Sequence, residues 1–143
     1  PIDREPEEIL VDLETGPYRL GDFQQFHLSL DAEKGFDTNP FLNYIALTEE
    51  VGELARAFKL MWSRESRLRA EGLSSQAALQ TAMATHRAKI QEELADCLAY
   101  LFKLSNYAGI DLEQAYLEKM NINARRIWQD SRVVRDGRED GSS

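Results

Sequence analysis

Two segments of the sequence, LTEEVGELARAF and IQEELADCLAYLF, combine carboxylates with apolar residues at helical spacing. Glu50 and Glu53 lie three positions apart in the first segment, and Glu93 and Asp96 do so in the second. This spacing places each pair on one side of its helix. A buried carboxylate without a partner is costly, so acidic groups on such apolar helices require a cation.

The two pairs would form an oxygen-only ligand set if the helices that carry them face each other. Hard divalent cations prefer such ligands, so the spacing predicts a Mg²⁺ site, with Mn²⁺ as an alternative. A single pair of this kind is ordinarily a solvated helix edge, and a surface that binds a basic partner protein is the non-enzymatic alternative. A di-iron site would require Glu-x-x-His pairs, and no histidine follows these carboxylates at that spacing.

A second set of polar residues lies near the end of the chain. Lys119, Asn123 and Arg126 follow one another at intervals of four and three residues, so they share one face of a helix. A point charge, an amide and a guanidinium fork suit the recognition of phosphate groups. Such a stripe alone is usually a solvated face, but beside a metal site it predicts a phosphate ligand.

Turn signals divide the chain into segments whose apolar residues recur at helical spacing. The predicted helices are Leu20–Ala32, Phe41–Arg64, Ser75–Tyr107 and a last helix that ends at about Trp128. Asn39 before Pro40, and Asp111 after Gly109, are the expected caps of the second and last helices. The alternative for the third segment is a short insertion helix followed by a separate helix from about Arg87. The pattern predicts an all-α fold, a helical bundle with a four-helix core.

A chain of 143 residues is expected to hold one domain. We expect residues 1–17 to be an N-terminal arm, 18–128 the helical domain with an insert at about 65–88, and 129–143 a C-terminal tail. The composition, 43% hydrophobic and 29% charged, is typical of a soluble globular protein. Residues 90–104 are apolar around most of a helical circumference, which predicts a central and largely buried helix.

The charge and cysteine content exclude several classes of partner. The net charge of −8 argues against a polynucleotide, because binding its backbone requires a surface rich in lysine and arginine. The single cysteine, Cys97, excludes an intramolecular disulfide and is expected in the core. No apolar run is long enough to span a bilayer and the acidic N-terminus lacks signal-peptide features, so we expect a cytoplasmic protein without a membrane partner.

Taken in order, the motifs EEVGE, EELAD and KMNINARR resemble the MazG-like all-α nucleotide pyrophosphohydrolases from about residue 20 to 128. The resemblance implies a nucleoside triphosphate substrate, hydrolysed to the monophosphate and pyrophosphate, and a homo-oligomer, either dimer or tetramer. It also implies site residues. Glu50, Glu53, Glu93 and Asp96 would hold Mg²⁺, and Lys119, Asn123 and Arg126 would contact the phosphates.

Further roles follow from that resemblance. Glu49 lies outside the two pairs and is expected to act as the catalytic base or to orient the residues that hold the metal. The candidates for base binding are Phe26, His27, Asn43, Trp62 and Tyr100. The expected role is the removal of non-canonical or surplus nucleotides, with dUTP or phosphoribosyl-ATP as alternative specific substrates. The insert is longer than in compact family members, so we expect it to cap the site or to form an interface.

Overall fold

The computed structural model describes residues 16–125, which form four α-helices and no strand. The helices are α2 (Leu20–Lys34), α3 (Pro40–Ala70), α4 (Ser75–Tyr107) and α5 (Leu112–Arg125). The predicted all-α class is therefore confirmed. Most of the predicted N-terminal arm, the predicted tail, Arg126 and Trp128 lie outside the described residues. No helix within 16–125 has the length and apolar character that a bilayer crossing requires.

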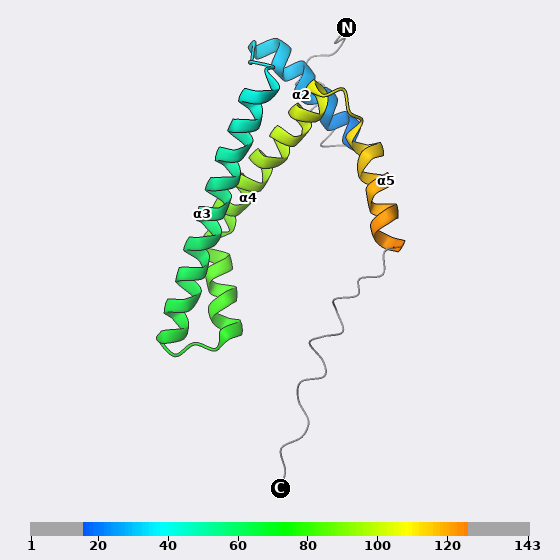
Figure 1. The fold of residues 1–143 in the computed structure, drawn as a ribbon. Coiled ribbons are helices and arrows are strands. Elements are labelled where there is room, and N and C mark those ends of the chain that lie inside the picture. The colour runs from blue at the N-terminus through cyan, green and yellow to red at the C-terminus, as the bar shows by residue number, and fades with distance from the viewer. Residues whose placement is uncertain (1–15, 126–143) are drawn as a thin grey trace.

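The helices form an arch (Figure 1). One leg is the antiparallel hairpin of α3 and α4, α2 crosses the top, and α5 descends on the other side. Small side chains line the seam of the hairpin: Ala57 is 3% exposed, and Ala78 and Ala82 are fully buried. Alanine lets the two backbones approach closely, so α3 and α4 pack tightly against each other where these residues lie.

The helix ends confirm the predicted caps. Asn39 Oδ1 accepts hydrogen bonds from the backbone amides of Phe41 and Leu42 at 2.9 and 3.3 Å, and Pro40 occupies the first helical position. Asp111 Oδ1 accepts from the amide of Gln114 at 3.0 Å. Between α4 and α5, Gly109 adopts a φ of +67°, which glycine tolerates better than any other residue.

Two helix boundaries and one alternative were wrong. The first predicted helix continues to Lys34 rather than Ala32, and the second to Ala70 rather than Arg64. The predicted insert is the distal end of the hairpin, because Leu68 of α3 and the buried alanines of α4 continue the seam beyond the charged segment. The third segment is one helix, so the alternative with a separate insertion helix is wrong.

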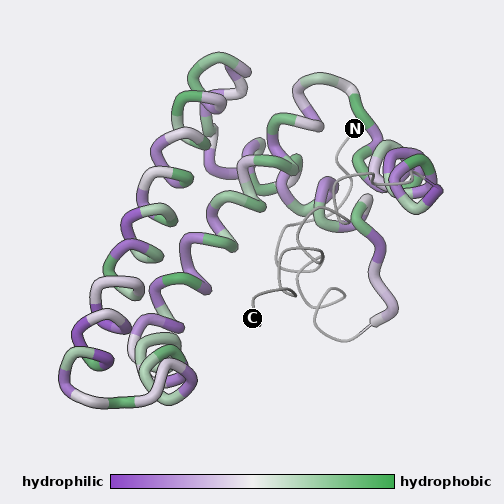
Figure 2. The backbone as a smooth tube through the Cα atoms, turned by 60° about the horizontal axis from the view of Figure 1, so that its bottom comes forward, coloured by the Kyte–Doolittle hydropathy of each residue, from purple (hydrophilic) through white to green (hydrophobic). Residues whose placement is uncertain are grey.

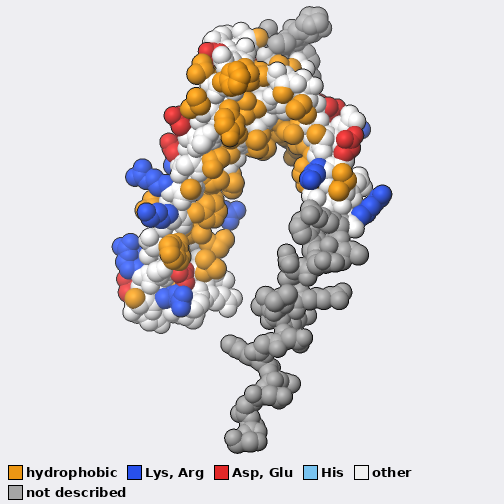
Figure 3. All heavy atoms as spheres, in the orientation of Figure 1, with side chains coloured by type: hydrophobic (Ala, Val, Ile, Leu, Met, Phe, Trp, Pro, Cys, Tyr) orange, Lys and Arg blue, Asp and Glu red, His pale blue; other side chains and the backbone are white. Residues whose placement is uncertain are grey.

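The prediction that residues 90–104 are largely buried is also wrong for the single chain. Leu94, Leu98 and Leu101 are 51%, 47% and 47% exposed, because α4 packs on α3 along one side and on α2 only near its end. Cys97 is half-buried rather than in the core. Hydrophobic and hydrophilic residues alternate along the hairpin (Figure 2), and hydrophobic side chains gather on the inner side of the arch (Figure 3). Leu94, Leu98 and Leu101 share one side of α4 by their spacing, and Phe58 of α3, also partly exposed, lines a groove together with Leu94. We call these four residues the apolar face.

A buried glutamine fixes the top of the arch. Gln24 Nε2 donates to Ser105 Oγ at 3.0 Å and to the Ile110 carbonyl at 2.9 Å, and Gln24 Oε1 accepts from the amide of Leu112 at 3.0 Å. These bonds join α2 to the end of α4 and the start of α5. The orientation of α2 over the hairpin is therefore set by polar contacts as well as by apolar packing.

Candidate metal centre

Three of the predicted ligands come together between α3 and α4. Glu50, Glu93 and Asp96 each offer a carboxylate oxygen, and these oxygens all lie within 4.8 Å of one another. Glu50 comes from α3, whereas the other two occupy one side of α4 at the predicted spacing of three residues. The antiparallel pairing of the helices thus converts two sequence motifs into one cluster.

Glu93 is the least exposed member of this cluster. Its side chain is 1% exposed, and one oxygen pairs with Lys89. The other oxygen, Oε2, is buried and accepts no hydrogen bond from the described residues. A buried carboxylate oxygen without a donor is rare in folded proteins, and here two further carboxylates adjoin it. The residues present therefore fit a bound divalent cation, whose charge would satisfy that oxygen.

The cluster concentrates negative charge. Burial raises the pKa of Glu50, and repulsion from Asp96, Glu53, Glu93 and Glu49 raises it further. Tyr100 is affected by the same carboxylates. Burial raises the pKa of its hydroxyl most, and repulsion from Glu50 raises it further. Metal binding would relieve this repulsion, because a cation favours the ionised form of every carboxylate around it.

Glu53 is not in the group of three. Its carboxylate lies 3.8 Å from Lys89 Nζ, and the same ammonium lies 3.3 Å from Glu92. The hydrogen bond to Glu93, followed by a weaker contribution from Glu92, raises the pKa of Lys89, so its ammonium stays charged. Lys89 was not among the predicted site residues, although its position four residues before Glu93 was a sequence signal for an ion pair.

The predicted phosphate-binding stripe lies on α5. Lys119 is exposed and Asn123 is half-buried, whereas Arg126 lies outside the described residues. Within the described chain α5 packs against α2, and it diverges from the hairpin (Figure 1). Within residues 16–125, the structure therefore does not bring Lys119 or Asn123 to the three carboxylates.

The predicted base-binding residues lie in three different places. His27 contacts Phe26 and stacks on Phe102, with ring centroids 5.2 and 5.9 Å apart, and burial lowers the pKa of His27.

Two other candidates lie on α3 rather than on α2. Trp62 is 68% exposed. Asn43 is buried, and its amide donates to the carbonyls of Asp37 and Asn39 at 2.7 and 2.9 Å, so that side chain closes the turn before α3.

Tyr100 lies beside a buried ion pair that was not predicted. Lys103 Nζ is 3.1 Å from Asp31 Oδ1, and their side chains are only 12% and 3% exposed. The hydroxyl of Tyr107 donates to the other Asp31 oxygen. The ammonium of Lys103 lies over the rings of Phe36 and Tyr100, 5.0 and 5.5 Å from their centroids. This cluster joins α2 to α4, and its Lys103 lies about two helical turns after Asp96 on α4.

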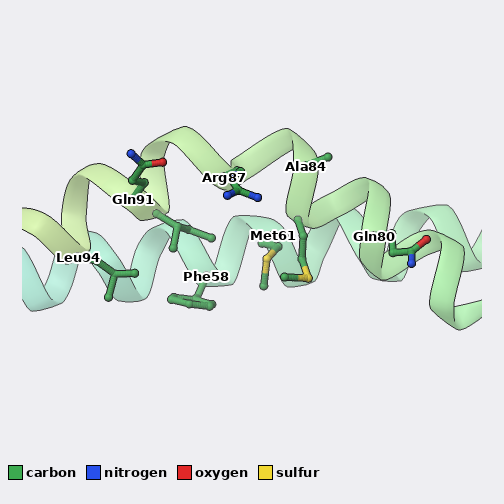
Figure 4. A pocket seen from close by; sticks show the side chains of 9 residues that line it. Phe58, Met61, Gln80, Ala84, Arg87, Gln91 and Leu94 are labelled. Atoms are coloured by element: carbon green, nitrogen blue, oxygen red, sulfur yellow. The ribbon is translucent and has the colours of Figure 1, made fainter.

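A groove of about 700 Å³ runs along the hairpin on the side of the predicted insert. Phe58 and Met61 of α3 and Leu94 of α4 line it with mostly apolar surface, and Arg87 and Gln91 supply its polar groups (Figure 4). Phe58 and Leu94 also belong to the apolar face. The groove is thus a continuation of that face toward the end of the hairpin.

Comparison with known proteins places these features in a family context. Residues 41–127, more than half of the chain, match the MazG nucleotide pyrophosphohydrolase domain. Human (Homo sapiens) dCTP pyrophosphatase 1 is 36% identical over 109 residues, covering 75% of this chain and 58% of that protein. The Bos taurus dCTP pyrophosphatase 1 is 34% identical over 120 residues, covering 78% of this chain and 64% of that protein. The chain therefore spans about three fifths of the length of these relatives.

Proposed function

The chain belongs to the MazG nucleotide pyrophosphohydrolase family, and on this premise we propose that it hydrolyses (deoxy)nucleoside triphosphates to the monophosphate and pyrophosphate in a Mg²⁺-dependent reaction. The observation that carries the proposal is the cluster of Glu50, Glu93 and Asp96 around a buried carboxylate oxygen without a donor. Such a site suits a hard cation that accompanies a polyphosphate. The expected physiological role is housecleaning of the nucleotide pool.

Glu50, Glu93 and Asp96 would hold the metal ion, and Glu53 would join them once it leaves Lys89. When bound, Mg²⁺ neutralises phosphate charge and acidifies a water molecule, and Mn²⁺ supplies the same chemistry. The reaction forms a bond between a water oxygen and the α-phosphorus and breaks the bond to the bridging oxygen, which leaves with pyrophosphate. Glu49 is exposed on α3, next to Glu50, and either accepts the proton of that water or orients the residues that hold the metal.

The remaining substrate contacts are proposed by residue type and position. Lys119, Asn123 and Arg126 would bind phosphate oxygens. Among the base-binding candidates, His27 and Tyr100 receive the most support, because both lie near Lys103 at the junction of α2 and α4. Phe26 adjoins His27 and extends the same apolar wall. Trp62 and Asn43 remain candidates for base binding. Because the amide of Asn43 already donates to two backbone carbonyls, we expect Asn43 to shape the site rather than to bind the base directly.

The apolar face supports assembly as a homo-oligomer, either a dimer or a tetramer. Its leucines are about half-exposed although they lie on a helix that also carries the metal ligands. A second copy would cover this surface, as is common where a helical subunit leaves one face unpaired. Light scattering of the purified protein measures the number of subunits directly.

The first experiment measures pyrophosphate release from a panel of ribo- and deoxyribonucleoside triphosphates, with Mg²⁺ and with EDTA. The names of the relatives place dCTP first in the panel, and dUTP and phosphoribosyl-ATP are included as alternatives. Glu93→Gln is expected to abolish the metal-dependent release while the protein stays folded. Glu71→Gln is the matched control, because Glu71 lies at the far end of α3.

Release that requires both the metal and Glu93 would establish the reaction, and the preferred substrate would indicate the role. Full metal-dependent turnover by Glu93→Gln would remove this residue from the site. Absence of release from every substrate, in protein shown to be folded, would contradict the enzymatic proposal and favour the non-enzymatic interaction module.

A further inference from the structure

In the described part of the chain, Lys89 is the only basic residue that forms ion pairs with Glu53, Glu92 and Glu93. Its Nζ lies 3.8 Å from Glu53 and 3.3 Å from Glu92, and it pairs with Glu93. The Lys89 side chain is 52% exposed, whereas that of Glu93 is 1% exposed. The ammonium therefore reaches a buried carboxylate from the solvent side.

These contacts explain the position of Glu53. A fourth ligand from α3 is expected beside Glu50, but the oxygens that lie within 4.8 Å of one another come from Glu50, Glu93 and Asp96 alone. Glu53 instead faces Lys89. An ammonium and a divalent cation that both contact Glu53 and Glu93 would repel each other. Like charges closer together than a Debye length are only partly screened by solvent.

We propose that Lys89 is a resident counter-cation of the metal centre, which neutralises Glu53 and Glu93 in the metal-free protein and must leave Glu53 when a divalent cation binds. The inference rests on the proposed function, because it assumes that the carboxylates hold a metal. The flexible four-carbon stem of lysine and its half-exposed position allow the ammonium to turn into solvent. Lys89 thereby stabilises the carboxylates when no metal is bound and lowers the affinity of the site for metal.

The test is a titration with Mn²⁺ alone, in which free Mn²⁺ is measured by electron paramagnetic resonance at low ionic strength. Lys89→Met removes the charge and keeps an apolar stem, and we expect its Kd to be about three to ten times lower than that of the original chain. Lys89→Arg keeps the charge and should bind Mn²⁺ no more tightly than the original chain. Lys59→Met is the control, because Lys59 lies on α3 without an ion pair in the described range.

A second measurement separates the two halves of the proposal. Lys89→Met should unfold at a lower temperature than the original chain in EDTA, because Glu93 then lacks its buried partner. Saturating Mn²⁺ should remove most of that difference, because the metal takes over the neutralisation of the same carboxylates. Lys59→Met should show neither effect.

Each other result is decisive. Unchanged Mn²⁺ affinity in Lys89→Met would overturn the proposal, and weaker affinity would overturn it by showing that Lys89 orients Glu93 for the metal. Equal tightening in Lys59→Met would assign the effect to net charge and overturn it as well. If the original chain binds no Mn²⁺, the metal centre itself fails together with the inference, whereas binding that ignores Lys89 leaves the proposed function intact.

Discussion

The buried ion pair between Asp31 and Lys103 should contribute strongly to the stability of the fold. At a separation of 3.1 Å the attraction amounts to about 5 kcal/mol at an effective dielectric constant of about 20. Lys103→Met keeps the stem but removes the charge. Among the described residues, the Asp31 carboxylate, 3% exposed, then has the hydroxyl of Tyr107 as its remaining side-chain donor. Removal of one partner of a buried pair costs about 3–5 kcal/mol, and the surviving hydrogen bond favours the lower end of that range.

Urea unfolding followed by circular dichroism would measure this loss. The control is Lys59→Met, an exposed position where a change within about 0.5 kcal/mol is expected. The double variant Asp31→Asn with Lys103→Met buries no charge, and the asparagine oxygen still accepts a hydrogen bond from Tyr107. Its loss of unfolding free energy should therefore be about 2 kcal/mol smaller than the sum of the losses in the two single variants. A loss below about 1 kcal/mol in Lys103→Met, or additive losses in the double variant, would refute the argument.

Two further predictions concern pH and phosphate binding. Burial lowers the pKa of His27 from 6.5, so below that pH the unfolded chain binds more protons than the folded chain. The contribution of His27 to the free energy of unfolding should therefore be fully present above about pH 6.5 and be lost as the pH drops through the lowered pKa. Urea unfolding of His27→Gln should show a smaller loss over the same pH range. An identical pH profile in this variant would exclude His27 as the cause. Arg126→Ala should weaken binding of a triphosphate more than of a monophosphate in calorimetric titrations, and equal weakening would argue against a contact to the outer phosphates.

The features that sequence predicted best are those decided within a few residues. The caps at Asn39 and Asp111 depend on hydrogen bonds to backbone amides two or three positions away, so residue type and order suffice. The spacing of Glu93 and Asp96 likewise fixes their common side of α4. The boundary at Arg64 was missed because a charged segment resembles a helix end, whereas Leu68 packs on the opposite helix and extends α3.

The features that sequence missed depend on which helix faces which. Leu98 lies on a helix that is apolar around most of its circumference, yet it is 47% exposed, because hydrophobic periodicity does not indicate whether a neighbour covers each side. Asp31 and Lys103 are 72 positions apart, and the crossing of α2 over the end of α4 brings them together. Lys89 contacts Glu53 across the hairpin for the same reason.

The packing of the hairpin and the charge of the candidate metal centre are energetically linked. Burial disfavours the charged form of Glu50 on α3, and repulsion from Asp96 and Glu93 on α4 adds to this effect, so the repulsion would push the two helices apart at this point. The alanine seam of α3 and α4 prevents that, because Ala57 and Ala82 keep the backbones close. Part of the free energy of packing therefore offsets the repulsion in the metal-free fold. A divalent cation that binds only the folded arrangement would remove this opposition, so added metal should stabilise the hairpin against unfolding.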